Sequence, residues 1–382
     1  MGNLADIRGA ETPWRPLELS IVVPTFKERD NVGELVRRIA ISLPDVHWEV
    51  IFVDDDSPDG TTEAIRKLAH QDHRVRCIHR IGRRGLTSAC IEGILSSSAT
   101  YVAVMDADLQ HDETILPEML RTLKAEPLDI VVGSRYVPGG AIGEWGKTRA
   151  KISQFATRLS HFVVPSELRD PMSGFFMMRR DVFLQCTRRL SGMGFKILVD
   201  LFASAPQALR FKEIPFVFKN RFAGESKLDN QVALDYVMLL LDKTVGHIVP
   251  VRFFSFALIG GLGLGVHFAV LAAMFKGAQL EFVAAQTVAT AVAMVFNFAL
   301  NNVITYKDKR LKGAAWMRGL ASFVLACGVG AFANVGIANY FYGRSGGWIL
   351  AALSGILVGA VWNYAVTSVY TWGATAKPSV NR

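Results

Sequence analysis

The sequence lacks the usual glycine-rich motifs for binding phosphate. Neither a dinucleotide signature nor a phosphate-binding-loop lysine motif follows the first apolar run, Leu19 to Val23. Because those motifs hold phosphate on backbone amides at the start of a helix, any phosphate ligand here must be held by side chains or a metal. Residues 1–18 also lack an apolar run, so we expect a flexible N-terminal tail with neither signal peptide nor anchor.

Cysteine and charge are also scarce. The four cysteines show neither metal-ligand nor disulfide spacing, which favours a reducing, cytosolic setting for the part outside the membrane. Charged residues make up 20% and hydrophobic residues 51%, a composition too apolar for a wholly water-soluble protein. The net charge of +8 is scattered and lacks an RNA-binding aromatic signature. We therefore expect an anionic membrane surface, and no nucleic acid, as the partner of this charge.

The apolar residues concentrate in residues 251–375. Four runs there are long enough to cross a membrane as helices: Phe253 to Phe275, Val283 to Thr305, Gly319 to Tyr342 and Trp348 to Tyr370. The link between the second and third runs carries Lys307, Lys309, Arg310, Lys312 and Arg318. By the positive-inside rule, this link, both termini and the N-terminal half are cytosolic.

The four runs contain an internal repeat. Phe296 to Ala299 matches Trp362 to Ala365, which indicates a duplicated helical hairpin. Small residues predict close helix packing: Gly260, Gly261, Gly263 and Gly265. Four amides at membrane depth either pair between helices or touch a lipid headgroup: Asn297, Asn301, Asn302 and Asn363.

Residues 230–250 link the two halves. Val232 to Val249 has the apolar spacing of an amphipathic helix. Such a helix either lies in the membrane interface or packs as an ordinary helix on the N-terminal domain, and the sequence leaves both interpretations open.

Residues 19–229 show the strand-and-helix alternation of an α/β domain. The expected strands are Leu19 to Val23, Val50 to Val53, Tyr101 to Met105 and Ile130 to Val132, and a helix is expected over Asn31 to Ile41. This pattern predicts a Rossmann-like, mostly parallel sheet that binds ligands at the carboxyl ends of its strands.

Acidic residues follow two of these strands directly. Asp106, Asp108 and Gln110 come just past Met105, and their oxygens suit Mg²⁺ or Mn²⁺ bridging a diphosphate, although a solvated turn can carry the same residues. The second cluster, Asp54 to Asp56, offers a carboxylate for a base or ribose. With Val23 to Glu28, three strand ends would converge on one crevice.

Taken together, these blocks resemble the family 2 glycosyltransferases of the GT-A fold, and among them the dolichyl-phosphate mannose synthases. The matching blocks are Val23 to Asn31, Val53 to Thr61, Met105 to His111, Gly133 to Gly140, Asp170 to Phe176, Gly194 to Leu198 and Arg221 to Lys227. The likeness covers nearly the whole chain, and the four-span part resembles a small GtrA-like, flippase-like domain. One departure is Phe26-Lys27, where the family usually has Tyr-Asn, so a stacking contact survives and a hydroxyl contact does not.

The resemblance implies roles for named residues. The nucleotide pocket would be formed by Pro24, Phe26, Glu28, Val53 and Asp55, and the metal and diphosphate would be held by Asp106, Asp108 and Gln110, with Ala107 between them. Positive charge around the phosphates would come from Arg135, Lys196, Arg221 and Lys227, and the acceptor phosphate would be held by Arg135, Arg149 and Ser153. Asp170 would position the sugar or Arg149, or else cap a helix. Asp108, Arg135, Arg149 and Asp170 are thus the expected catalytic residues.

The implied reaction is an inverting transfer of mannose from GDP-mannose to dolichyl or another polyprenyl phosphate, with a divalent metal, in a bacterial or archaeal-type plasma membrane. UDP-glucose or another nucleotide sugar with undecaprenyl phosphate is the alternative, because motifs that hold diphosphate do not identify the base. A lipid-linked sugar flippase ranks lower, since the acidic motif is intact. A processive polysaccharide synthase is disfavoured because no Gln-x-x-Arg-Trp motif is evident.

Overall fold

The computed structural model describes residues 16–142, 155–192, 194–219, 230–246, 249–345 and 348–373. The chain divides into two compact units, Met1–His247 and Ile248–Arg382, and each is described by itself.

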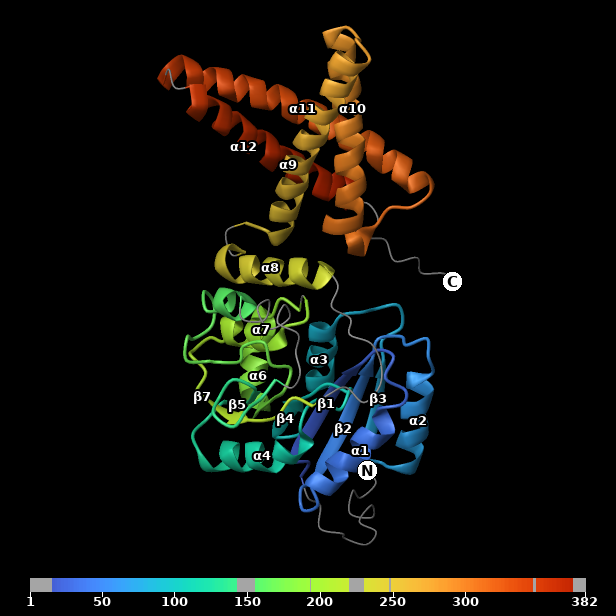
Figure 1. Ribbon diagram of the computed structural model, residues 1–382, viewed down its shortest axis with the longest axis vertical. Coiled ribbons are helices and arrows are strands. Elements are labelled where there is room, and N and C mark those ends of the chain that lie inside the picture. Colours follow the sequence, from blue (N-terminus) through green and yellow to red (C-terminus); the bar gives the residue numbers. More distant parts are fainter. Residues whose placement is uncertain are drawn as a thin grey trace, which may run out of the picture. The chain divides into compact units, whose positions relative to one another are not determined.

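The first unit is built on a seven-stranded sheet with the order β3-β2-β1-β4-β6-β5-β7 (Figure 1). The strands are β1 Leu19–Thr25, β2 Trp48–Asp54, β3 Val75–His79, β4 Tyr101–Val104, β5 Ile130–Ser134, β6 Phe176–Arg179 and β7 Phe211–Pro215. All neighbouring pairs are parallel except those of β6, which runs antiparallel to β4 and β5. The expected mostly parallel sheet is therefore confirmed, and the four expected strands lie within a residue or two of their predicted bounds.

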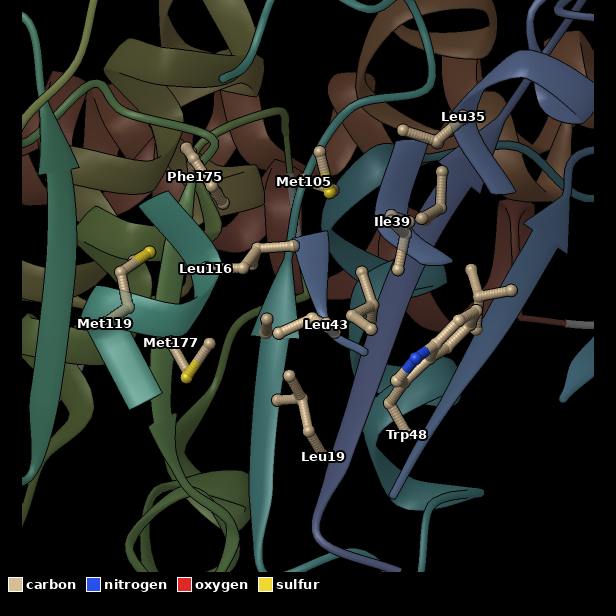
Figure 2. Close-up of a cluster of buried hydrophobic side chains, with 14 of the residues drawn as sticks. Leu19, Leu35, Ile39, Leu43, Trp48, Met105, Leu116, Met119, Phe175 and Met177 are labelled. Carbon is tan, nitrogen blue, oxygen red and sulfur yellow. The ribbon is translucent and has the colours of Figure 1, made fainter. Parts of the chain in front are cut away.

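Helices cover both faces of this sheet. They are α1 Val32–Ser42, α2 Thr61–Gln71, α3 Leu86–Leu95, α4 Leu116–Ala125, α6 Arg180–Cys186, α7 Ile197–Ser204 and α8 Asn230–Val245. Side chains alternate along each strand, so Leu19 and Ile21 belong to one core cluster while Val22 belongs to the other. Figure 2 shows the first cluster, in which Leu35 of α1 and Leu116 of α4 pack over β1 and β4.

The last helix of this unit, α8, is packed against its second core cluster. Leu239 is fully buried in that cluster, and the Tyr236 hydroxyl donates a hydrogen bond to the Ala156 carbonyl oxygen at 2.7 Å. Val237 stays exposed. One side of α8 thus packs on the N-terminal domain as an ordinary helix. A position of its exposed side in the membrane interface stays a prediction.

The second unit consists of four long helices: α9 Val251–Ala272, α10 Phe282–Leu300, α11 Ala314–Ser345 and α12 Trp348–Val366. Within the described residues, 4 helical stretches are long and apolar enough to cross a membrane: Val251–Gly277, Phe282–Thr305, Ala314–Phe332 and Leu353–Thr371. The second and fourth end in π-helical turns, Asn301–Thr305 and Thr367–Thr371, at corresponding positions of the internal repeat.

Each hairpin is closed by a glycine–asparagine contact. A Cβ added at Gly263 of α9 would lie 2.0 Å from Asn297 Oδ1 of α10, and one at Gly330 of α11 would lie 2.1 Å from Asn363 Oδ1 of α12. The repeat thus places an amide against a glycine in both hairpins. Gly260, Gly261 and Gly265 have no atom within 4 Å of such a Cβ among the described residues, so the close packing predicted for them is not made within this part of the chain.

The other two membrane-depth amides also form hydrogen bonds. Asn301 Nδ2 donates to the Asn297 carbonyl oxygen, and Asn301 Oδ1 accepts from the Thr305 hydroxyl. The Asn302 amide bonds both the backbone N–H and the carbonyl oxygen of Leu311. The described bonds of Asn301 thus lie within its own helical stretch, whereas Asn302 Oδ1 also accepts the Trp372 indole N–H at 3.2 Å and so pairs across to the second hairpin. Contact of these amides with a lipid headgroup stays a prediction.

The two hairpins meet through an aromatic cluster that repeats the duplication. The ring centroids of Phe298 in the first hairpin and Phe323 in the second lie 5.7 Å apart. Those of their counterparts, Tyr364 and Phe256, lie 5.8 Å apart. Tyr306 and Trp372, also counterparts, stack with ring centroids 4.1 Å apart. The contact is thus reciprocal, as across a two-fold axis.

Candidate active site

The carboxyl ends of β1 and β2 bring the expected nucleotide residues together. Pro24 of β1 pairs in register with Val53 of β2, so the residues after each strand share one edge of the sheet. At that edge the Glu28 carboxylate accepts a hydrogen bond from the Asn31 side chain at 2.7 Å, and its backbone N–H donates to the Thr61 hydroxyl at 3.0 Å. The loop that carries Phe26 and Glu28 is therefore tied to the start of α2.

The first acid of the β2 cluster is structural. The Asp54 carboxylate is fully buried and accepts hydrogen bonds from the hydroxyls of Thr25, Ser57 and Thr62 and from the backbone N–H of Ser57. It joins β1, the loop and α2, and its oxygens are saturated by the protein itself.

The second acid, Asp55, holds the loop before α3. One carboxylate oxygen accepts from Arg80 Nη1 at 2.8 Å and the other from the Gly85 backbone N–H at 2.7 Å. Burial raises the pKa of this carboxyl, against the opposing effects of the Gly85 N–H and the Arg80 charge. Arg80 itself is buried, and the sequence analysis missed it because no motif links it to Asp55.

The face of Phe26 is covered by a cation. The Arg84 guanidinium lies 4.2 Å from the ring centroid, and the Lys27 ammonium lies 5.6 Å from it. Lys27 has a φ of 58°, and its backbone N–H donates to the Ser57 hydroxyl. The aromatic surface expected to stack a base is thus flanked by two positive charges.

The acidic turn after β4 lies beside the end of β1, because these two strands are parallel neighbours. The Asp106 side chain is 37% exposed, whereas Ala107 and Asp108 are buried. The Asp108 carboxylate accepts the backbone N–H of Gln110 at 3.1 Å. One carboxylate therefore faces out while the other shapes the turn.

His111 supports this turn and was not given a role from the sequence. Its Nδ1 accepts the Asp106 backbone N–H at 3.0 Å, which leaves the ring hydrogen on Nε2, 3.8 Å from Asp106 Oδ2. The ring is buried and stacks on Phe175 with centroids 5.1 Å apart. A Cβ at Gly174 would lie 3.3 Å from Asp106 Oδ2, so a glycine there keeps space beside that carboxylate.

Gln110 ties the acidic turn to the segment after β7. Its Nε2 donates to the Lys219 carbonyl oxygen at 2.9 Å, and the Lys219 backbone N–H donates to the Gln110 carbonyl oxygen at 3.0 Å. Among the described residues no three His, Cys, Asp or Glu side chains gather as a ready metal site. Two carboxylates and an amide nevertheless fit Mg²⁺ or Mn²⁺ when a diphosphate and water complete the oxygen shell.

Arg135 and Asp170 form a buried ion pair. Arg135 Nε and Nη2 each donate to an Asp170 oxygen at 2.7 Å, and the Arg135 backbone N–H donates to the same carboxylate at 3.0 Å. Burial alone would lower the Arg135 pKa, but the hydrogen bonds and charge of Asp170 outweigh it and raise that pKa. Asp170 is wholly buried, so its described contact with the predicted site is made through Arg135.

The remaining predicted residues divide into one that the structure describes and four that it does not. Lys196 precedes α7 and places its Nζ 3.4 Å from the Met172 carbonyl oxygen, next to the Asp170–Phe176 block. Arg149, Ser153, Arg221 and Lys227 lie outside the described residues.

Two family models match the chain. Residues 20–186 match the family described as glycosyl transferase family 2, and residues 255–372 match the GtrA/DPMS transmembrane domain.

Named relatives match one or both halves. A dolichol-phosphate mannosyltransferase of Pyrococcus furiosus is 32% identical over 93% of this chain and 99% of the relative. That of Saccharomyces cerevisiae is 36% identical over 59% of this chain and 86% of its own length. Among solved structures, the glucosyl-3-phosphoglycerate synthase of Mycobacterium tuberculosis covers 62% of this chain and 86% of its own, with 15% identity and a TM-score of 0.47.

Proposed function

The chain belongs to the family 2 glycosyltransferases, in the group of the dolichol-phosphate mannosyltransferases, and from this membership we propose that it transfers mannose from GDP-mannose to dolichyl or another polyprenyl phosphate. The observation that carries the proposal is the relative of that name, which aligns over 99% of its length and thus includes both the α/β unit and the membrane unit.

In the proposed site, Asp106, Asp108 and Gln110 hold the metal and the donor diphosphate. A bound Mg²⁺ or Mn²⁺ would neutralise charge that develops on the leaving diphosphate. Lys196, whose Nζ lies 3.4 Å from the Met172 carbonyl oxygen, is assigned the role of a cation that binds the diphosphate, as are Arg221 and Lys227. Pro24, Phe26, Glu28, Val53 and Asp55 form the nucleotide pocket at the adjoining strand ends.

The acceptor phosphate needs no general base. A phosphate monoester has a second pKa near 6 and is therefore already a nucleophile at neutral pH. One of its oxygens attacks the anomeric carbon, the bond from that carbon to the diphosphate oxygen breaks, and the configuration inverts to a β-linked product. Arg135, Arg149 and Ser153 anchor the acceptor, and Asp170 fixes one side of the Arg135 fork, so phosphate contacts must use the remaining N–H groups.

The test is a donor and acceptor screen on the full-length protein in liposomes. GDP-mannose or UDP-glucose is supplied with dolichyl phosphate or undecaprenyl phosphate, the lipid product is identified by mass spectrometry, and its anomer by NMR. We expect a β-mannosyl phosphate lipid from GDP-mannose. Turnover of UDP-glucose in preference to GDP-mannose would overturn the donor assignment, and an α-linked product would overturn the single displacement.

A further inference from the structure

The loop before α7 is held by a buried carboxylate. Asp200 in α7 is wholly buried and accepts hydrogen bonds from the backbone N–H groups of Ser191 and Gly192 and from the Ser191 hydroxyl. Asp200 thus fastens the start of the loop that ends at Lys196.

The carboxylate is neutralised from a different helix. The Lys243 ammonium, near the end of α8, lies 2.7 Å from Asp200 Oδ1, with side-chain exposures of 7% and 0%. The same ammonium donates to the Arg189 carbonyl oxygen at 2.8 Å and to the Ser204 hydroxyl at 2.9 Å. A lysine has three N–H donors, so all three donors of Lys243 bond to α7 or to the loop before it.

The middle of the loop is held from two sides. Gly194 has a φ of +71°, and a Cβ added there would lie 3.6 Å from Asp235 of α8. The Gly194 carbonyl oxygen accepts the Thr87 hydroxyl of α3 at 2.9 Å. The path of the chain into Lys196 is therefore set by α3 on one side and by α8 on the other.

We propose that Lys243 is a positioning residue for the donor diphosphate, which acts by holding Lys196 through Asp200, whose backbone N–H donates to the Lys196 carbonyl oxygen at 3.2 Å, and through residues 189–192 and 194–195. This inference rests on the proposed function and on the phosphate role assigned there to Lys196. The ion pair joins this loop at Arg189, Ser191 and Gly192, so its loss would loosen the segment that precedes Lys196. Movement of the Lys196 backbone would displace its ammonium from the diphosphate, and misplacement of a positioning group by about 1 Å can be costly.

The test compares Lys243→Met with Lys196→Ala and with the double variant in the full-length protein. For Lys243→Met we expect the Michaelis constant for GDP-mannose and the dissociation constant for GDP with Mn²⁺ to rise about ten-fold, and the acceptor Michaelis constant to stay unchanged. Because Lys243 acts through Lys196, the double variant should bind donor no more weakly than Lys196→Ala alone. Lys243→Arg should recover part of the loss.

Lys212→Met is the matched control, since Lys212 pairs with Glu126 on the exposed surface, away from this loop. If Lys243→Met fails to fold, Thr87→Val tests the same loop without leaving a buried charge, and it too should weaken donor binding selectively. An unchanged donor constant in the folded Lys243→Met or Thr87→Val protein, or additive losses in the double variant, would overturn the inference. Absence of turnover in the unmodified protein with any donor would instead overturn the proposed function.

Discussion

Asp108 lies just past β4 with a buried side chain, and it is assigned to the metal. We expect Asp108→Asn to lose most turnover, because the proposed site loses an anionic ligand while the amide still accepts the Gln110 N–H. The thermal unfolding midpoint should change little. Near-normal turnover of this variant with Mg²⁺ or Mn²⁺ would show that the carboxylate does not hold a metal.

Asp170→Ala would remove the carboxylate that accepts hydrogen bonds from Nε, Nη2 and the backbone N–H of the buried Arg135. Asp170→Ala should therefore lower the free energy of unfolding by about 3–5 kcal/mol. Asp181→Ala is the control, since Asp181 pairs with Arg179 at the surface and its loss should cost at most about 1 kcal/mol. Urea unfolding of both variants checks the difference, and equal losses would contradict a special role for the buried pair.

Arg149 tests the division between donor and acceptor. If it holds the lipid phosphate, Arg149→Ala should weaken acceptor use by about 2–3 kcal/mol and leave GDP binding nearly unchanged. Arg149→Lys should recover only part, because an ammonium lacks the planar fork. Acceptor kinetics together with GDP titration decide this; a matching loss of GDP affinity would move Arg149 to the donor side.

For single residues, the positions of the acidic groups could be predicted from the sequence, but the separate role of each carboxylate could not. Three adjacent carboxylates at the end of β2 look alike in a sequence, yet the Asp54 carboxylate is saturated by hydroxyls and a backbone N–H, and Asp55 is paired with Arg80. The Arg135–Asp170 pair could not be predicted, because the two residues meet only when β5 and the segment before β6 come together. The hydrogen bond by which His111 supports the backbone of Asp106 has no signature in residue spacing either.

The elements themselves were easier to predict, since hydrophobic periodicity depends on local geometry. The α1 helix buries Val32, Leu35, Val36 and Ile39, a spacing visible in the sequence. The sequence did not allow us to predict which of the small residues in α9 would contact a neighbouring helix. Of four clustered glycines in α9, only Gly263 has a close neighbour among the residues that the structure describes, because the crossing of α9 and α10 selects one position on the helix.

That selection gives a test of each hairpin. Gly263→Ala and Gly330→Ala would place a methyl group against an asparagine, so each should destabilise the membrane unit by about 1–3 kcal/mol. Gly261→Ala is the matched control on the same helix, because no atom of the described part of the chain lies within 4 Å of a Cβ added at Gly261. Thermal unfolding in detergent measures all three, and an equal effect of the control would contradict the close contact.

For the whole molecule, the division at His247 predicts that the catalytic unit works when detached. A chain ending at Gly246 keeps the buried Lys243 and should still use a short, water-soluble polyprenyl phosphate analogue. Its use of a long-chain acceptor in liposomes should fall steeply, because a membrane anchor confines enzyme and lipid to one surface. A folded truncation that is inactive on the short acceptor would mean that the spans contribute to the site.

The reciprocal aromatic contacts between the hairpins bear on how the membrane unit came to be. Two separate copies of one hairpin would form a dimer through the same ring contact made twice. In the present chain these two contacts are Phe298 with Phe323 and Tyr364 with Phe256. Fusing the copies into one chain replaces an encounter between molecules by one within a molecule, so the pair no longer depends on protein concentration. Fusion also frees the copies to diverge. Asn302, whose Oδ1 accepts the Trp372 indole N–H, has a serine at the corresponding position of the second copy, Ser368.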